Sequence, residues 1–313
     1  MGEIEVLDPA MKKLVPADAK IEVLCDGFDW SEGPVWVPDQ ACLLFSNIPQ
    51  NAIVRWSERS GCIGYLKPAG YTGSAPRGGE SGTNGLALDL EGRLIMCQHG
   101  DRRVARMDAP LDKPRPKFVT LADKFQGKRL NSPNDLVVHS SGAIYFTDPP
   151  YGLEGNMDDP AKELPFQGVF RIAPDGKVTL ITKELERPNG IALSPDEKTL
   201  YVANSHLPNP VIMKFSLQAD GDVGEGRPLF DAHVLPATLL GSCDGMTVDQ
   251  HGNLFATGPG GVLVLAPDGK HLGTILTTQR TANCKFGEDG STLFITADNY
   301  LLRVRTSTKG LGF

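Results

Sequence analysis

The hydrophobic and polar residues of the chain follow a pattern that recurs six times. Each unit begins with an amide or carboxylate residue, usually followed by glycine, and continues as apolar segment, polar turn and second apolar segment. We call the six starting residues the anchors: Glu32, Asn84, Asn134, Asn189, Asp244 and Asn283. Successive anchors are 52, 50, 55, 55 and 39 residues apart, which suits the four-stranded blade of a β-propeller.

Further apolar segments supply the third and fourth strands of the blades. "GVFRIAPDG" and "KVTLITKE" follow in the third unit, and "GVLVLAPDG" and "HLGTILTT" follow in the fifth. The sixth unit stops after "YLLRVRT", whereas residues 21–28, "IEVLCDGF", form a spare strand ahead of the first anchor. We therefore predict an all-β, six-bladed β-propeller whose ring is closed by an N-terminal strand that completes the last blade.

This parse assigns residues 1–20 to an N-terminal extension and residues 21–313 to a single propeller domain. An alternative arrangement of alternating strands and helices is disfavoured, because no window shows a convincing apolar period of about 3.6 residues. With 40% hydrophobic and 22% charged residues, the chain can bury a sizeable core.

The composition also limits the partners and the location of the protein. A net charge of −7 without a run of Lys or Arg argues against a nucleic-acid partner. No stretch approaches the roughly 20 apolar residues that span a bilayer, so no membrane association is expected. Residues 1–20 do not resemble a signal peptide, which predicts a cytoplasmic protein, or a periplasmic one if a leader has been removed. No protein partner is implied.

The cysteines give a different kind of expectation. There are six, without C-x-x-C or other paired spacing, so we expect reduced, buried residues and neither a disulfide framework nor a zinc site. Cys243 lies in Gly-Ser-Cys-Asp-Gly, which matches the spacing of a hydrolase nucleophile elbow. An elbow needs a helix after the nucleophile, whereas "MTVDQHGNLFAT" predicts strand and turn, so we expect Cys243 to be a packing residue.

Propeller geometry predicts a site from the anchors. The first strand of each blade lines the central channel, so all six anchors should face one mouth of it. Asn-Gly and Asp-Gly are also good turn residues, which is the simpler explanation for any single anchor. Six oxygen-bearing side chains in register favour instead a hard divalent cation such as Ca²⁺, Mg²⁺ or Mn²⁺.

Other polar residues should border the same mouth. His99 follows the second strand of its unit, although a lone loop histidine more often makes a structural hydrogen bond. "KRLNSPND" brings Arg129, Asn131 and Asp135 towards the rim. The arginine there could bind a polyol or a carboxylate, or could neutralise neighbouring acids.

Four motifs together resemble one known family. "SEGPVW", "RLNSPND", "RPNGIALSPD" and "CDGMTVDQHGN" are similar to motifs of the gluconolactonase and regucalcin (senescence marker protein) family of sugar lactonases, and the resemblance covers nearly the whole chain. It implies a six-bladed propeller with one divalent cation in the channel, most often Ca²⁺, with Zn²⁺ or Mn²⁺ as alternatives. The implied metal ligands are Glu32, Asn134, Asn189 and Asp244.

The resemblance also implies a reaction. We expect metal-dependent hydrolysis of a sugar-acid lactone, D-glucono-1,5-lactone or a related aldonolactone, to the free acid. The cation would polarise the carbonyl, and Asp244 would be the catalytic base. The predicted substrate-binding residues are Arg129, Asn131, Asp135 and His99. Two alternatives stay open, namely a propeller phosphotriesterase of the fluorophosphatase type and a non-catalytic binding propeller.

Overall fold

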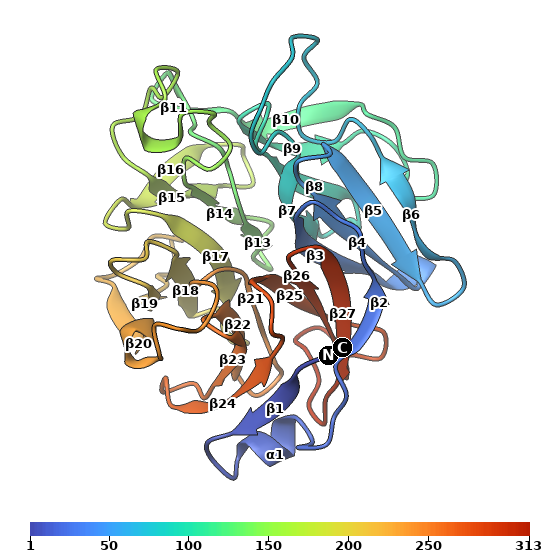
Figure 1. Cartoon of the computed structure of the whole chain (residues 1–313). Coiled ribbons are helices and arrows are strands. Elements are labelled where there is room, and N and C mark those ends of the chain that lie inside the picture. The colour runs from blue at the N-terminus through green and yellow to red at the C-terminus, as the bar shows by residue number, and fades with distance from the viewer.

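The computed structural model describes all 313 residues and is a six-bladed β-propeller, with the blades arranged around a central channel (Figure 1). The first blade comprises β3 (Ser31–Val37), β4 (Cys42–Asn47), β5 (Ala52–Ser57) and β6 (Gly61–Leu66). The second comprises β7 (Thr83–Leu88), β8 (Leu94–Gln98), β9 (Arg103–Met107) and β10 (Phe118–Ala122). The third comprises β13 (Leu136–Val138), β14 (Ile144–Asp148), β15 (Gly168–Ile172) and β16 (Val178–Thr182).

The other three blades repeat this antiparallel order. The fourth comprises β17 (Pro188–Leu193), β18 (Thr199–Asn204), β19 (Val211–Ser216) and β20 (Arg227–Asp231). The fifth contains β21 (Met246–Val248), β22 (Leu254–Gly258), β23 (Gly261–Leu265) and β24 (His271–Leu276). The sixth contains β25 (Thr281–Gly287), β26 (Thr292–Ala297), β27 (Tyr300–Arg305) and β2 (Glu22–Cys25). A small ribbon outside the blades pairs β11 (Lys124–Phe125) with β12 (Lys128–Arg129).

The ring closes between the sixth and the first blade, as predicted. β2 pairs antiparallel with β27 and becomes the outermost strand of the sixth blade. The innermost strands β25 and β3 also contact each other across this junction. Phe294 of β26 packs against Trp36 of β3 and Trp56 of β5, with ring centroids 5.7 and 5.1 Å apart. Closure therefore joins strands from both ends of the chain by backbone and aromatic contacts.

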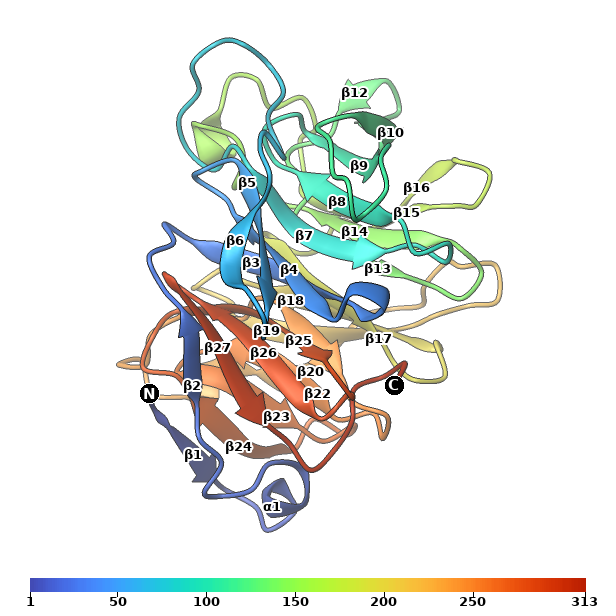
Figure 2. The same cartoon turned by 90° about the vertical axis from the view of Figure 1, so that its right-hand side faces the viewer.

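The N-terminal residues add one feature that the sequence did not predict. β1 (Glu3–Val6) pairs with β24 and gives the fifth blade a fifth strand. The short helix α1 (Met11–Leu14) follows it, at the bottom of Figure 2, and buries Met11 and Leu14 against the fifth and sixth blades. None of the helices is long and apolar enough to cross a membrane.

The core consists of apolar layers between neighbouring blades. Strands such as β4, β14 and β22 are buried along their whole length, because both faces of each sheet pack against the next sheet. The layer between the first and second blades, for example, joins Val35 and Leu44 to Leu86 and Met96. Each blade thus depends on both neighbours for burial of its apolar side chains.

A disulfide corrects the prediction that all cysteines are reduced. Cys25 of β2 and Cys62 of β6 are bonded, with Cα atoms 6.4 Å apart. The spacing pattern could not reveal this pair, because ring closure brings the outermost strand of the sixth blade against the outermost strand of the first. The other four cysteines, at positions 42, 97, 243 and 284, are free and buried, as expected.

Loss of this disulfide should destabilise the protein measurably. It closes a loop across 37 residues, for which chain entropy gives a contribution of about 4 kcal/mol. We expect the Cys25→Ser/Cys62→Ser double variant to lose up to about this much free energy of unfolding in urea. Wild-type protein in reductant should match the double variant. Titration of six rather than four thiols in unreduced, denatured protein would contradict the disulfide.

Candidate active site

The anchors lie where each blade enters its innermost strand. Strand pairing is irregular at these points in four blades, between Glu32 and Val35, Thr83 and Leu86, Pro188 and Ile191, and Thr281 and Asn283. In the other two blades, the anchors Asn134 and Asp244 precede the first paired residue of β13 and β21. An irregular strand start frees the local backbone from the ladder, so anchor side chains can turn towards the channel.

Glycines after the anchors let neighbouring blades approach closely. A Cβ on Gly190 would lie 2.1 Å from the carbonyl oxygen of Asp244 in the next blade. A Cβ on Gly245 would lie 2.0 Å from Cγ of Asn283. Only glycine fits at such distances, so the residue after each of these anchors is fixed by the packing of the ring.

Five of the six anchors line one cavity of about 740 Å³ at a mouth of the channel. They are Glu32, Asn84, Asn134, Asn189 and Asp244. Four of them are nearly inaccessible, and Asp244 is half-buried. The four metal ligands predicted from the family resemblance, Glu32, Asn134, Asn189 and Asp244, are therefore brought together.

Three anchor oxygens in this cavity have no hydrogen-bond partner although they are buried. They are the Oδ1 atoms of Asn84, Asn134 and Asp244. Glu32, in contrast, accepts a 2.6 Å hydrogen bond through Oε2 from the amide of Gly33. Unpartnered buried oxygens cost free energy, so a ligand that binds oxygen would stabilise this arrangement.

The carboxylates of the site have raised pKa values. Burial, together with the charge of Asp135, raises the pKa of Glu32 to about 8. Burial, then Glu32 and other nearby carboxylates, raises the pKa of Asp244 well above its usual value. Like charges in a poorly solvated cavity disfavour ionisation, and a bound cation would reverse this effect.

The donor set fits a hard cation better than a soft one. The structure contains no cluster of three or more His, Cys, Asp or Glu side chains able to hold a metal. Only two carboxylates, Glu32 and Asp244, are among the anchors of the cavity, so the remaining donors are amide oxygens of asparagine. A mixed set of carboxylate and amide oxygens suits Ca²⁺, Mg²⁺ or Mn²⁺ and does not suit a thiolate-type zinc site.

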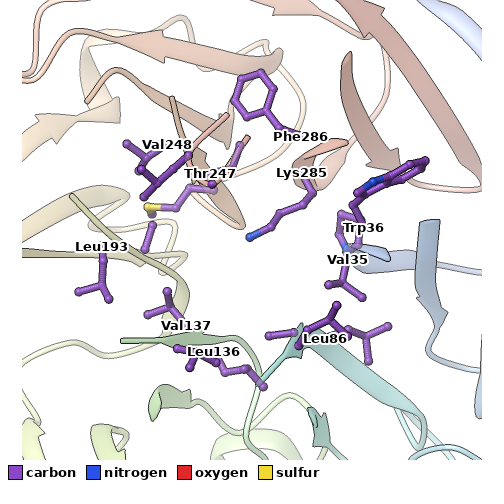
Figure 3. Close-up of a pocket in the computed structure, with 18 of the residues that line it drawn as sticks. Val35, Trp36, Leu86, Leu136, Val137, Leu193, Thr247, Val248, Lys285 and Phe286 are labelled. Atoms are coloured by element: carbon purple, nitrogen blue, oxygen red, sulfur yellow. The ribbon is translucent and has the colours of Figure 1, made fainter. Parts of the chain in front are cut away.

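The opposite opening of the channel has a different character. It forms a cavity of about 590 Å³ with mainly apolar walls, into which Lys285 projects among Val35, Leu86 and Val137 (Figure 3). The sixth anchor, Asn283, lines this cavity, and its Oδ1 accepts a hydrogen bond from the amide of Cys284. Asn283 is thus the one anchor that lines the apolar cavity and does not line the polar one.

Asp135, predicted to bind substrate, also lines the apolar cavity and does not line the polar one. Its Oδ1 accepts a hydrogen bond from the amide of Leu136. Burial raises its pKa to about 6, partly offset by this amide and by Lys285. Asp135 follows Asn134 directly, and successive residues of an extended segment point to opposite sides.

Three other predicted substrate-binding residues do not line the polar cavity either. Asn131 is fully buried and donates its side-chain amide to the carbonyl oxygens of Asp148 and Phe166. Arg129 lines a separate cavity and donates to the carbonyl oxygen of Asp101. His99 is fully buried, with Nδ1 3.1 Å from Oε2 of Glu80, and it is Glu80 that lines the polar cavity.

Several cavity residues were not singled out from the sequence as substrate contacts. They come from segments outside the repeated strands: Trp30, Glu80, Tyr151, Arg187, Ser205, His206 and Arg280. Arg187 lies over the ring of Tyr151, with 5.5 Å to its centroid, and the Tyr151 hydroxyl hydrogen-bonds that of Ser205. The sequence holds a signal for three of them. His206 comes just after the second strand of its unit, and Glu80 and Tyr151 lie in long, polar, glycine-containing loops typical of the rim of a site.

The fold and site together define a six-bladed propeller with an acidic, oxygen-lined cavity at one mouth of its channel. Residues 30–299 match the family model described as "SMP-30/Gluconolactonase/LRE-like region", and the chain belongs to this family. It is 43% identical to a gluconolactonase of Zymomonas mobilis, over 99% of this chain and 88% of that protein.

Solved structures are also similar. The structure of a gluconolactonase from Xanthomonas campestris superposes with a TM-score of 0.83 at 33% identity, covering 98% of this chain and 95% of that one. A calcium-binding regucalcin from Agrobacterium tumefaciens shares the fold, with a TM-score of 0.72 at 19% identity, covering 93% of this chain and 95% of that one.

The glycine contacts lead to a stability prediction. We expect Gly190→Ala to lose about 3 kcal/mol of unfolding free energy, because its Cβ would overlap the Asp244 backbone. Gly64→Ala is the matched control, since a Cβ there meets nothing within 4 Å. Urea unfolding of both variants measures the difference. Equal stability of the two variants would contradict the close packing of the anchor ring.

The raised pKa of Glu32 predicts how stability depends on pH. The folded protein binds this proton more tightly than the unfolded chain, whose pKa is near 4.5. The stability that the folded protein gains from binding this proton more tightly is therefore lost as the pH rises towards about 8. We expect the melting temperature in chelator to fall over this range, and less so with excess calcium. Glu32→Gln should flatten the dependence, and an unchanged slope in that variant would contradict the assignment.

Proposed function

We propose that the protein is a metal-dependent lactonase that opens a sugar-acid lactone, D-glucono-1,5-lactone or a related aldonolactone, to the free acid. The observation that carries the proposal is the group of three unpartnered anchor oxygens beside Glu32 in one cavity. The gluconolactonase relatives support the choice of a lactone.

The cavity supplies the ligands of one divalent cation, for which we propose Ca²⁺. Glu32, Asn134, Asn189 and Asp244 are the proposed ligands, and the free Oδ1 of Asn84 makes it a further candidate. A bound cation would supply Lewis acidity towards the lactone carbonyl oxygen. Two carboxylates among the donors would balance its charge.

Asp244 is the proposed catalytic base. Its Oδ1 has no partner within the protein and belongs to the cavity wall, so it can accept a hydrogen bond from a water molecule there. Removing a proton from that water would generate the nucleophile that attacks the lactone carbonyl carbon. The same carboxyl could then return the proton to the ring oxygen as the C–O bond breaks.

Glu80 is the second carboxylate that can contact the substrate. It lies on the loop of residues 68–82, and Nδ1 of the buried His99 is 3.1 Å from its Oε2. His99 is fully buried, so its role would be to orient Glu80 and not to touch the lactone. Glu80, Arg187 and His206 offer donors and acceptors for the hydroxyl groups of a polyol.

The expected cytoplasmic location stays a prediction, and one observation disfavours it. Disulfides persist mainly in oxidising compartments, and Cys25 and Cys62 form one here. An extracytoplasmic location, such as the periplasm, fits this bond better.

The mechanism predicts the behaviour of an Asp244 variant. Because general-base catalysis contributes about 10²–10⁴-fold, Asp244→Asn should lower kcat for gluconolactone by at least about 100-fold. The assay is acid release at constant pH, corrected for spontaneous opening. Asp268→Asn, in a surface turn of the fifth blade, is the control and should behave as wild type.

Chelation tests the cation in the same assay. Protein dialysed against chelator should lose activity and regain it with calcium. Full activity of Asp244→Asn or of the chelated protein would refute the mechanism.

Comparison of substrates distinguishes the alternative functions. Faster turnover of a fluorophosphate ester than of any lactone would assign the site to the phosphotriesterase class. No turnover of either substrate would favour a binding propeller.

A further inference from the structure

A second polar cavity contains three arginine side chains. It has a volume of about 590 Å³ and shares no lining residue with the cavity of the anchors. Arg77 comes from the loop of residues 68–82, Arg102 from the turn between β8 and β9, and Arg129 from β12. Segments distant in sequence therefore bring three guanidinium groups to one place.

None of these arginines forms an ion pair with a carboxylate. The arginine ion pairs of the structure involve Arg93, Arg103, Arg303 and Arg305 instead. Arg77 donates to the carbonyl oxygens of Gly100 and Gly152, and Arg129 donates to that of Asp101. Backbone carbonyls hold the guanidinium groups in position but leave their charges unpaired.

Two of the arginines also keep buried N–H groups without a partner. Nη2 of Arg102 and Nε of Arg77 make no hydrogen bond. Arg102 is only 4% exposed, and its other donors bond the carbonyl oxygens of Leu130, Asn131 and Ala161. Burial and the nearby charge of Arg129 lower the pKa of Arg102, and the charges of Asp148, Glu163 and Asp159 offset this only in part. An unpaired, buried guanidinium next to another one is unfavourable unless an anion joins them.

The acidic residues of the cavity do not fill this role. Asp159 accepts hydrogen bonds from the amides of Gly155 and Ala161 in its own turn. Glu154 is exposed at the edge and forms no ion pair, and Glu163, which lies outside the lining, accepts from the amide of Arg129. A small oxyanion with several acceptor atoms could satisfy both orphan donors at once.

We infer that this three-arginine cavity binds a phosphate group. The planar fork of arginine matches phosphate oxygens in geometry as well as charge, and three forks from different segments would surround the anion. The group could belong to inorganic phosphate or to a sugar phosphate, since both present the same terminal oxygens.

Binding would have a structural consequence for the neighbouring site. Arg77 is three residues from Glu80 on one loop, which is rich in glycine. Gly152, whose carbonyl Arg77 contacts, separates Tyr151 of the anchor cavity from Leu153 of the arginine cavity. A phosphate that links Arg77 to Arg102 and Arg129 would therefore fasten this loop to the second blade and to the β11–β12 ribbon.

The test is calorimetric titration of the full chain with inorganic phosphate and with glucose 6-phosphate, at constant ionic strength in chloride. We expect the wild type to bind at least one of these two ligands saturably and to show no binding of glucose. The Arg77→Gln and Arg129→Gln variants should bind the same ligand at least tenfold more weakly. Arg102→Gln should have the largest effect, but its three carbonyl contacts also support the fold. The two other variants keep the test decisive.

Variants of the anchor cavity show whether phosphate binds in the three-arginine cavity or beside the anchors. Arg187→Gln and Arg280→Gln should leave phosphate binding unchanged, since both residues line only the other cavity. If these variants abolish binding while Arg77→Gln and Arg129→Gln do not, the anion binds beside the anchors and the inference is wrong. Absence of saturable binding by the wild type would also overturn it. Neither result depends on lactone hydrolysis.

Discussion

The structure depends on how closely the innermost strands of neighbouring blades can approach. Where Gly190 meets Asp244, and where Gly245 meets Asn283, there is no room for a Cβ atom. This contact keeps the anchor ring narrow. Burial and the charge of Glu32 raise the pKa of Asp244 there, and three amide or carboxylate oxygens are left without partners. The packing that stabilises the ring therefore also creates an electrostatic cost at its centre, which a cation could offset.

The repeated part of the sequence predicted the fold and most of the anchor ring, because the position of a residue within a repeat determines its position around the channel. The same reasoning failed for residues beside the repeats. Asp135 follows an anchor by one residue and so faces the opposite opening. The side-chain amide of Asn131 donates hydrogen bonds to the carbonyl oxygens of Asp148 and Phe166, contacts that only the tertiary structure could show. Glu80 and Arg187 reach the cavity from segments without any periodic signal.

The two openings of the channel divide the chemistry of the molecule. One is polar and surrounded by long segments that carry Glu80 and Tyr151, whereas the other is apolar and holds the single cation Lys285 (Figure 3). The C-terminal residue Phe313 lines the apolar opening. Variation in the long segments could change which molecules the polar cavity accepts without altering the ring, since those segments contribute little to the layers between the blades.

Ring closure has a consequence for how the chain reaches its native state during synthesis. β2 leaves the ribosome long before β27, which is its only backbone partner in the sixth blade. β1 is likewise synthesised long before its partner β24. For most of translation these two segments therefore have no strand to pair with. A circular permutant that begins at the turn before β3 and places β1 and β2 after β27 would remove this delay. Its folding yield would then show whether the wait exposes the nascent chain to aggregation.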